Sequence, residues 1–180
     1  ERDQEVDVLL DPMEEDQDLY PKLLVLYSEQ VNGFYDDDSK ELCVVSQKGE
    51  LGPLEKVISA HEYTHALQDQ YFDLNSLPLE AKGNSDLSLA ALSLVEGDAT
   101  LAQIVYMIRE LSQSEQEALL QELEEFGSEK YEAAPRVIRE NLNFPYDSGE
   151  AFVLALYNQG GWEAINQAYS DPPQSTEQVL

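Results

Sequence analysis

Several residue types that often reveal a protein's function are scarce in this chain, which has one cysteine, two histidines and ten basic residues among 180. The single cysteine, Cys43, excludes an internal disulfide, and its apolar neighbours predict a small buried residue in a strand. With 37 acidic residues the net charge is −27, and like-charge repulsion argues against binding to nucleic acid or anionic membranes. No apolar run approaches the ~20 residues that span a bilayer, so no membrane insertion of this segment is expected.

Length and composition predict a single domain over residues 1–180, because a chain of this size can bury a core and its apolar content is that of a globular protein. Residues 1–18 are rich in acids and are expected to form a loose arm or a first short helix. The sequence begins without methionine or a signal peptide, and residues 175–178 (STEQ) predict the start of a helix at its other end. We therefore expect an excised or processed domain with a truncated C-terminus, from an extracellular or cell-surface protein.

The pattern of apolar residues predicts an α+β fold that is mostly helical, with one small β-hairpin near the N-terminal side. Strands are expected at 33–35 and 42–45, joined by the turn residues of 36–40. The helix expected from Asn84, Ser85 or Asp86 to about Leu111 is apolar nearly all round, which predicts a central position. The other helices are expected at 23–31, 53–71, 114–126, 128–141, 150–158 and 162–169, and the loops at 73–84 and 145–149.

Both histidines lie in one five-residue stretch, 61–65 (HEYTH), within the helix expected to begin at Pro53. Positions i and i+4 lie on the same face of a helix, so His61 and His65 can both reach one metal ion. Glu62 is one position further round, close to the ion and yet free not to bind it. The pattern HExxH is typical of zinc hydrolases, in which that glutamate is the general base.

A hydrolytic zinc site usually takes three protein ligands and leaves the fourth position to water. Glu96 is the expected third ligand, because a carboxylate in the middle of an apolar helix is costly unless it is paired or binds a metal. Gly97 is a poor helix former, and close approach of the motif helix is one reason to tolerate it. The arginines that could instead pair with Glu96 are Arg109, Arg136 and Arg139, and the alternative aspartate ligands are Asp69, Asp73, Asp86 and Asp98.

The motif at 61–65, followed by residues 96–99 (EGDA), resembles the gluzincin clan of HExxH zinc metallopeptidases, and the compact layout is similar to minigluzincin-type domains. The resemblance is specific over about residues 33–105. It implies zincin-like helices and a Zn²⁺ cofactor bound by His61, His65 and Glu96. It also implies hydrolysis of peptide bonds by a metal-activated water, with Glu62 as the general base. The substrate would be a peptide or an unfolded protein, aligned along an exposed edge strand of the hairpin.

The chain departs from the gluzincin pattern at Thr100, because many gluzincins carry an aspartate four residues after the ligand glutamate that braces a ligand histidine. Here Asp98, or the hydroxyl of Thr100, is expected to provide that support. The donor for the oxyanion must be a tyrosine, an arginine or a backbone N–H, since no further histidine exists. Tyr146, in the loop expected before a helix, is the first candidate, ahead of Tyr157 and Tyr106.

Three other functions are compatible with the sequence. The domain could be an inactive zinc-binding domain that acts as a structural or interaction module, with Asp98 or a tyrosine as a fourth ligand in the water position. It could be an acidic helical interaction module in which HExxH arose by accident. It could also be a latent enzyme whose cleft is covered by its first residues or by a further part of the protein. The intact Glu62 favours an active enzyme, because a structural zinc site does not need it.

Overall fold

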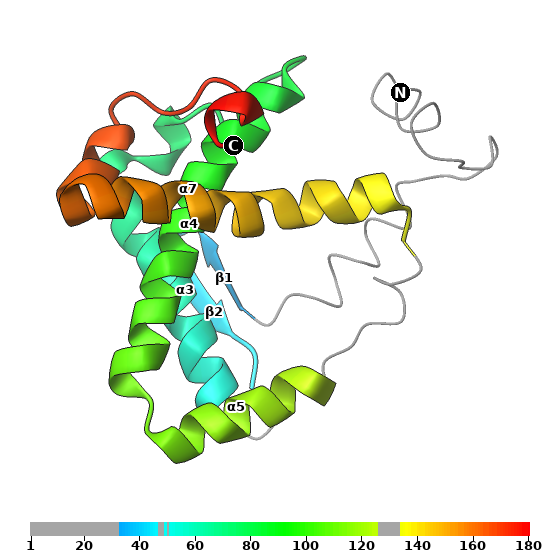
Figure 1. Ribbon diagram of the computed structural model, residues 1–180, viewed down its shortest axis with the longest axis vertical. Coiled ribbons are helices and arrows are strands. Elements are labelled where there is room, and N and C mark those ends of the chain that lie inside the picture. Colours follow the sequence, from blue (N-terminus) through cyan, green and yellow to red (C-terminus); the bar gives the residue numbers. More distant parts are fainter. Residues whose placement is uncertain (1–32, 47–48, 50, 126–133) are drawn as a thin grey trace.

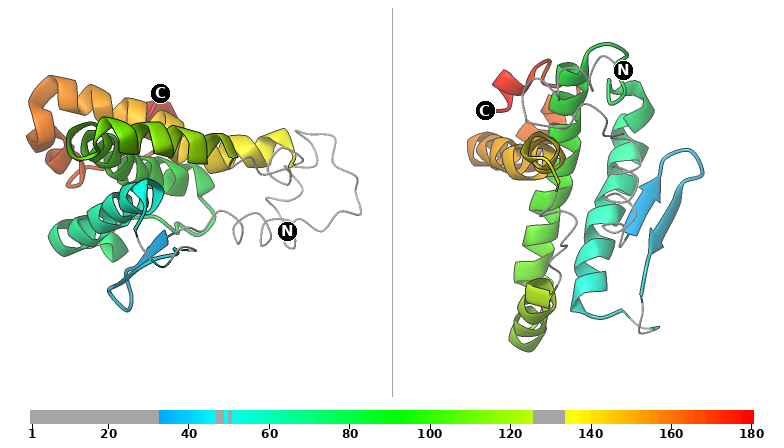
Figure 2. Two further views of the ribbon diagram at one scale, coloured as in Figure 1. Left: turned by 90° about the horizontal axis from the view of Figure 1, so that it is seen from below. Right: turned by 90° about the vertical axis from the view of Figure 1, so that its right-hand side faces the viewer.

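The computed structural model describes residues 33–46, 49, 51–125 and 134–180, and the mostly helical α+β class is confirmed. The elements are β1 (Gly33–Asp36), β2 (Glu41–Val44), α3 (Pro53–Phe72), α4 (Ser85–Glu110), α5 (Gln113–Glu125) and α7 (Arg136–Ala168), with the short 3₁₀ turns η1 (Leu74–Ser76) and η2 (Thr176–Gln178). Figure 1 shows α3 and α4 side by side with α7 across them, and Figure 2 shows the hairpin on the side of α3 that faces away from α4.

Some expectations concern residues outside the described ranges. They are the acidic arm at 1–18, the helix at 23–31, the end of the helix at 114–126 and the first part of the helix at 128–141. These remain predictions.

The hairpin forms where the sequence predicts it, because turn residues separate two short strands. Phe34 pairs with Cys43 across the antiparallel strands. In the turn, Oδ1 of Asp36 accepts hydrogen bonds from the backbone N–H groups of Asp38 (2.9 Å) and Ser39 (3.2 Å). The run of three aspartates therefore ends β1 and begins the turn of the hairpin.

A buried carboxylate attaches the hairpin to α3. Asp69 is 6 % exposed, and its Oδ2 accepts hydrogen bonds from the hydroxyl of Tyr35 (2.7 Å) and from the ammonium group of Lys40. Because both donors belong to the hairpin and the acceptor belongs to α3, this ion pair fixes the position of β1 on the helix that carries the HExxH motif.

Helices α3 and α4 run antiparallel and are joined by the loop 73–84, which contains η1 (Figure 2). As predicted, α3 begins with Pro53, whose missing N–H costs nothing at the first helical position. It ends at Phe72, and its C-cap Asp73 adopts a left-handed conformation with φ of 55°. At the start of α4, Oδ1 of Asn84 accepts a hydrogen bond from the N–H of Leu87 at 3.2 Å, as the sequence predicts for a cap. Local signals therefore set the starts of both helices.

Helix α4 is the central helix that its apolar sequence predicts. Four of its apolar residues have no exposed surface: Ala90, Ala91, Leu94 and Ala99. By length and composition alone α4 is also apolar enough to cross a membrane, a test that core helices of soluble proteins pass as well. Here it packs between α3 and α7, and the expectation of no membrane insertion remains a prediction.

Helix α7 crosses α4 at a steep angle, and two glycines make the crossing close (Figure 1). A Cβ added at Gly97 of α4 would lie 2.2 Å from the carbonyl oxygen of Gly149 on α7, and a Cβ added at Gly149 would lie 2.4 Å from that of Ser93. The sequence-based prediction that Gly97 faces the motif helix is wrong. Since successive residues are about 100° apart around a helix, Gly97 faces α7 while Glu96 faces α3.

The prediction of a loop at 145–149 is also wrong, because α7 continues through it. Proline in a helix interior removes one hydrogen bond and usually ends or bends the helix. Here Pro145 is buried, Gly149 packs against α4 and Val153 is completely buried, so tertiary packing outweighs the local preference. The predicted break at 160–161 is confirmed, since both glycines have non-helical backbone angles.

The pattern at 175–178 produces the single 3₁₀ turn η2, and the predicted capping box does not form. Ser175 makes no side-chain hydrogen bond as a cap. Instead, the backbone N–H and the hydroxyl of Thr176 donate to Oδ1 of Asp86, at 3.2 and 2.6 Å. This contact attaches η2 to the first turn of α4.

A capping box that the sequence analysis missed begins α5. The N–H and the hydroxyl of Ser112 donate to Oε2 of Glu115 at 2.9 and 2.6 Å, and the N–H of Glu115 donates to Oγ of Ser112 at 3.4 Å. Glu115 also forms an ion pair with Lys56 of α3 at 2.7 Å. The hydrogen bond from Lys56, followed by those from Ser112, lowers the pKa of Glu115 to about 2. The start of α5 is thereby joined to α3.

We expect Glu115→Gln to destabilise the fold near neutral pH and to lose this effect in acid. Because the pKa of Glu115 is lower in the folded chain than its unfolded value of about 4.3, its contribution is complete above that pH and disappears as the pH falls toward 2. The difference in urea midpoint between wild type and variant should be larger near pH 6 than near about pH 3. Glu117→Gln on the same helix is the control, and a difference for Glu115→Gln that is equal at both pH values would contradict the lowered pKa.

Candidate metal centre

Two histidines of α3 and one glutamate of α4 meet where these helices pack together. The Nε2 atoms of His61 and His65 are 3.1 Å apart, and Oε2 of Glu96 lies 3.1 Å from the first and 3.5 Å from the second. The side chains of both histidines are 12 % exposed and that of Glu96 is 14 % exposed. These are the three residues predicted to bind a metal. Within the described ranges, they form the one group of three or more such side chains close enough to share an ion.

The spacing of the three atoms fits a tetrahedral metal ion. Zinc holds nitrogen and oxygen ligands at about 2.0–2.1 Å, so two ligands at tetrahedral corners are about 3.3–3.4 Å apart. The observed separations of 3.1, 3.1 and 3.5 Å lie on both sides of that value. The three side chains therefore fit three corners of such a site without rearrangement.

Both imidazoles contact a side-chain amide through the nitrogen that faces away from the centre. Nδ1 of His65 lies 2.8 Å from Oε1 of Gln68, and Nδ1 of His61 lies 3.2 Å from Oε1 of Gln103. An amide oxygen only accepts hydrogen bonds, so each Nδ1 carries a proton, and Nε2 of a neutral ring then has a lone pair. With both rings neutral, three acceptor atoms converge, and either a proton on one imidazole or a metal cation completes this arrangement.

The pKa values of Glu96 and His65 show how the negative charge of Glu96 is balanced when no metal is bound. Burial alone would raise the pKa of Glu96, but hydrogen bonds with His61 and His65 lower it to about 2. Burial alone would lower the pKa of His65, but the hydrogen bond with Glu96 raises it. A proton on an imidazole thus balances the carboxylate, and a bound metal ion would displace that proton.

Glu62 lies beside this cluster, on the side of the hairpin. Burial raises its pKa, whereas the nearby His65 and His61 and a hydrogen bond from the backbone of Tyr35 lower it. Gly33 of β1 lies against its side chain, since an added Cβ would be 3.2 Å from Cγ of Glu62. The hairpin therefore restricts the orientations of this carboxylate, which stays near the cluster without belonging to it.

The aspartates considered as alternative ligands have other contacts. Asp69 binds two side chains of the hairpin, and Asp86 binds the first residue of η2. Asp73 is the C-cap of α3. Oδ2 of Asp98 accepts two hydrogen bonds from groups outside the cluster. Of the acidic residues considered, Glu96 is therefore the one that the fold directs at the histidines.

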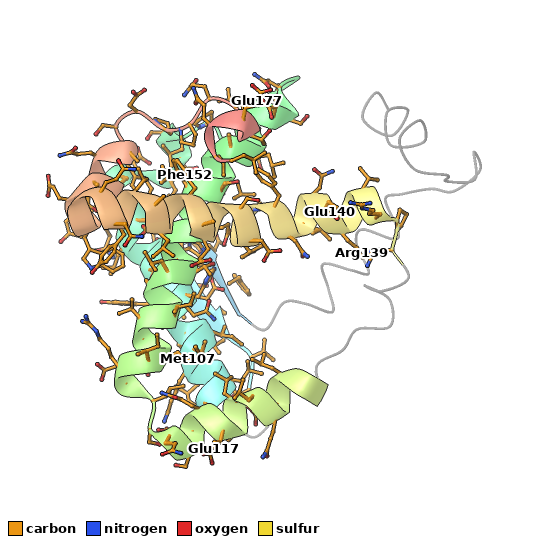
Figure 3. The ribbon with its side chains drawn as sticks, viewed as in Figure 1. Met107, Glu117, Arg139, Glu140, Phe152 and Glu177 are labelled. Atoms are coloured by element: carbon orange, nitrogen blue, oxygen red, sulfur yellow. The ribbon has the colours of Figure 1, made fainter. Side chains whose placement is uncertain are left out.

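The arginines considered as partners of Glu96 do not reach it. In the described part of the chain, none of Arg109, Arg136 and Arg139 forms an ion pair with Glu96, and Arg136 pairs with Glu140 at 3.3 Å. Figure 3 shows Arg139 and Glu140 on the end of α7 that projects beyond α4, away from the packed helices. Glu96 therefore has only imidazoles as its charged partners among these residues.

Comparisons of the chain with models of protein families, with curated proteins and with solved structures found no match. The resemblance to gluzincins consequently rests on the sequence itself, with its motifs at 61–65 and 96–99. Any function proposed for the centre must follow from the chemistry of its own side chains.

Asp98 and Thr100 are the two residues expected to brace a ligand histidine. The hydroxyl of Thr100 is buried and has no hydrogen-bond partner among the described residues, so it braces no histidine. Asp98 does not contact His65 directly and supports it through a hydrogen bond with Gln68. Nε2 of Gln68 donates to Oδ2 of Asp98 at 2.9 Å and to the carbonyl oxygen of Val95 at 3.0 Å, while its Oε1 faces His65.

Sequence analysis missed both glutamines that contact the histidines. Gln68 follows His65 by three positions, and Gln103 follows Glu96 by seven, so each shares a helix face with a predicted ligand. Glutamine is not a usual zinc ligand, and spacing was the one signal in the sequence that could have identified these residues.

Of the three tyrosines considered as oxyanion donors, Tyr146 is the one that lies beside the centre. Its ring stacks on that of His61, with centroids 6.2 Å apart and planes inclined by 29°, and it is 45 % exposed. It belongs to α7 and not to the predicted loop. Tyr157 packs against Trp162, at 5.1 Å between ring centroids, and Tyr106 lines a groove that is separate from the centre.

That groove has a volume of about 530 Å³ and lies between β2, α3 and α4. It is lined by Leu42, Leu51, Lys56, Ser59, Ala60, Tyr63, Thr64, Ala102 and Tyr106. Because these α3 residues occupy a different face of the helix from His61 and His65, the groove is not part of the candidate metal centre.

Proposed function

We propose that this chain is a zinc metallopeptidase, a hydrolase that cleaves peptide bonds in peptides or unfolded proteins. The observation that carries the proposal is the convergence of three lone-pair donors, Nε2 of His61, Nε2 of His65 and Oε2 of Glu96, at separations suited to one zinc ion. Glu62 lies directly beside them, as a general base must.

In the proposed reaction the chain's side chains hold the ion and move the proton. When bound, zinc would polarise the scissile carbonyl and lower the pKa of a water molecule to about 7. Glu62 accepts the proton of the attacking water and later delivers it to the leaving amine. The backbone N–H of Tyr35 and the close contact with Gly33 keep the carboxylate in position for both steps. Tyr146, stacked on His61, is the proposed donor to the oxyanion.

The contacts of Asp98 support an active centre over a structural zinc site. Structural sites are closed by four protein ligands, whereas catalytic sites keep one position open. In the described ranges three side chains form the cluster, and Asp98, a candidate for the fourth ligand, is held elsewhere by Gln68 and Tyr169. An open fourth position beside Glu62 is what hydrolysis requires.

Metal analysis tests the proposal most directly. Protein purified without added metal is expected to contain about one equivalent of zinc, and His65→Ala to contain little, because two ligands hold zinc far more weakly than three. Tyr63→Ala, an exposed position on the same helix, is the control and should retain the metal. Wild-type protein should cleave a generic unfolded protein, and a chelator should stop the cleavage. Folded wild-type protein that takes up no zinc would refute the proposal.

A further inference from the structure

The amide group of Gln68 has one possible orientation, because its surroundings leave no choice. The two groups that face one end of the amide are the carbonyl of Val95 and the carboxylate of Asp98, at 3.0 and 2.9 Å. Both are acceptors, so the NH₂ group must face them and the oxygen must face His65. Gln68 is 2 % exposed, so water cannot readily substitute for any of these partners.

The acceptor character of Asp98 is in turn secured by Tyr169. The hydroxyl of Tyr169 donates to the same Oδ2 atom at 2.8 Å, so this oxygen accepts from both sides. Asp98 and Tyr169 are 7 % and 6 % exposed. The ring of Tyr169 stacks on Phe72 at the end of α3, with centroids 4.0 Å apart and planes 6° apart, which fixes the hydroxyl against α4.

We propose that Gln68, Asp98 and Tyr169 are positioning residues that set the tautomer and the ring orientation of His65 for metal binding. The direction of hydrogen bonds runs from Tyr169 to Asp98, from Gln68 to Asp98, and from Nδ1–H of His65 to Gln68. In the neutral ring Nε2 of His65 thereby carries the lone pair, and it faces Nε2 of His61 and Oε2 of Glu96. The proposal rests on the proposed zinc binding, and it makes the end of α7 part of the metal centre.

The test is the zinc affinity of the full chain, measured by competition with a chelator of known affinity. Gln68→Met keeps the size of the side chain and removes its hydrogen bonds, and we expect its zinc affinity to fall about 10- to 100-fold. Tyr169→Phe removes one hydroxyl and should give a smaller loss. Asp98→Asn can place its amide oxygen where Oδ2 lies, so it should bind zinc more tightly than Asp98→Leu, which offers no acceptor.

A second measurement separates positioning from general destabilisation. With two histidines in the chain, ¹⁵N-labelled imidazoles give a spectrum that is simple to assign. In zinc-loaded wild type the Nδ1 proton of His65 should be visible and protected from exchange, and in zinc-loaded Gln68→Met this protection should be lost while that of His61 remains. Thermal unfolding of each variant shows whether the fold is intact.

The outcomes distinguish the two proposals. Wild type that binds no zinc would overturn both the proposed function and this inference. Wild type that binds zinc, together with Gln68→Met that binds it equally well and protects the same proton, would overturn the inference alone. Zinc binding that follows the expected order of variants supports the inference even if no substrate is cleaved.

Discussion

Glu62→Gln is expected to abolish detectable peptide hydrolysis while leaving the zinc content unchanged. Proton transfer by a general base contributes typically about 10²–10⁴-fold to a rate, and an amide cannot accept the proton of the attacking water. Glutamine has nearly the shape of glutamate, and Glu62 is not one of the three clustered ligands, so the metal centre should persist. The measurement is zinc content together with cleavage of a generic unfolded protein, made on wild type and variant side by side.

Glu55→Gln is a suitable control, because Glu55 lies in the first turn of the same helix and its replacement removes the same charge. This variant should retain both zinc and cleavage. Zinc in Glu62→Gln with cleavage at the wild-type rate would show that Glu62 is not the base. Zinc in all proteins with cleavage in none would instead favour a structural zinc module or a latent enzyme.

Gly97→Ala is expected to destabilise the fold strongly, although alanine is the better helix former by about 1 kcal/mol. The added Cβ would lie 2.2 Å from the carbonyl oxygen of Gly149, and this backbone cannot move away without displacing α7. Overpacking typically costs about 1–3 kcal/mol, and a clash with backbone should lie at the upper end of that range or above it. Urea unfolding should show this as a lower midpoint, and zinc affinity should fall as α7 shifts.

Gly52→Ala is the matched control, since the atoms near its added Cβ belong to the carboxyl end of the Glu55 side chain, which can change rotamer, and not to backbone. This change should cost about 1 kcal/mol or less. A Gly97→Ala protein as stable as wild type would mean that α7 does not cross α4 at this point.

The parts of the fold that the sequence predicted correctly are those set by local chemistry. Pro53 at the start of α3, Asn84 at the start of α4 and the glycines at 160–161 act through their own backbone preferences or their nearest neighbours. The grouping of His61, His65 and Glu96 was equally predictable, because the two histidines are four residues apart on one helix and the glutamate is a carboxylate in an apolar helix.

The parts that the sequence did not predict depend on contacts between distant segments. Pro145 indicates a helix end locally, yet the packing of Gly149 against α4 carries α7 through it. The neighbour of Gly97 could not be identified without knowing where α7 lies. The link between Asp98 and Tyr169 joins residues 71 positions apart, and no spacing rule connects them.

This difference in sequence separation has a kinetic consequence. His61 and Glu96 are 35 positions apart on two helices that a short loop joins, so they can meet early during folding, whereas Tyr169 reaches Asp98 only after the last helix has docked. Contacts that close longer loops form more slowly, because a larger entropy loss precedes them. A refolding chain should therefore bring the three proposed ligands together before Tyr169 docks, and uptake of the proposed zinc ion should begin before the native structure is complete.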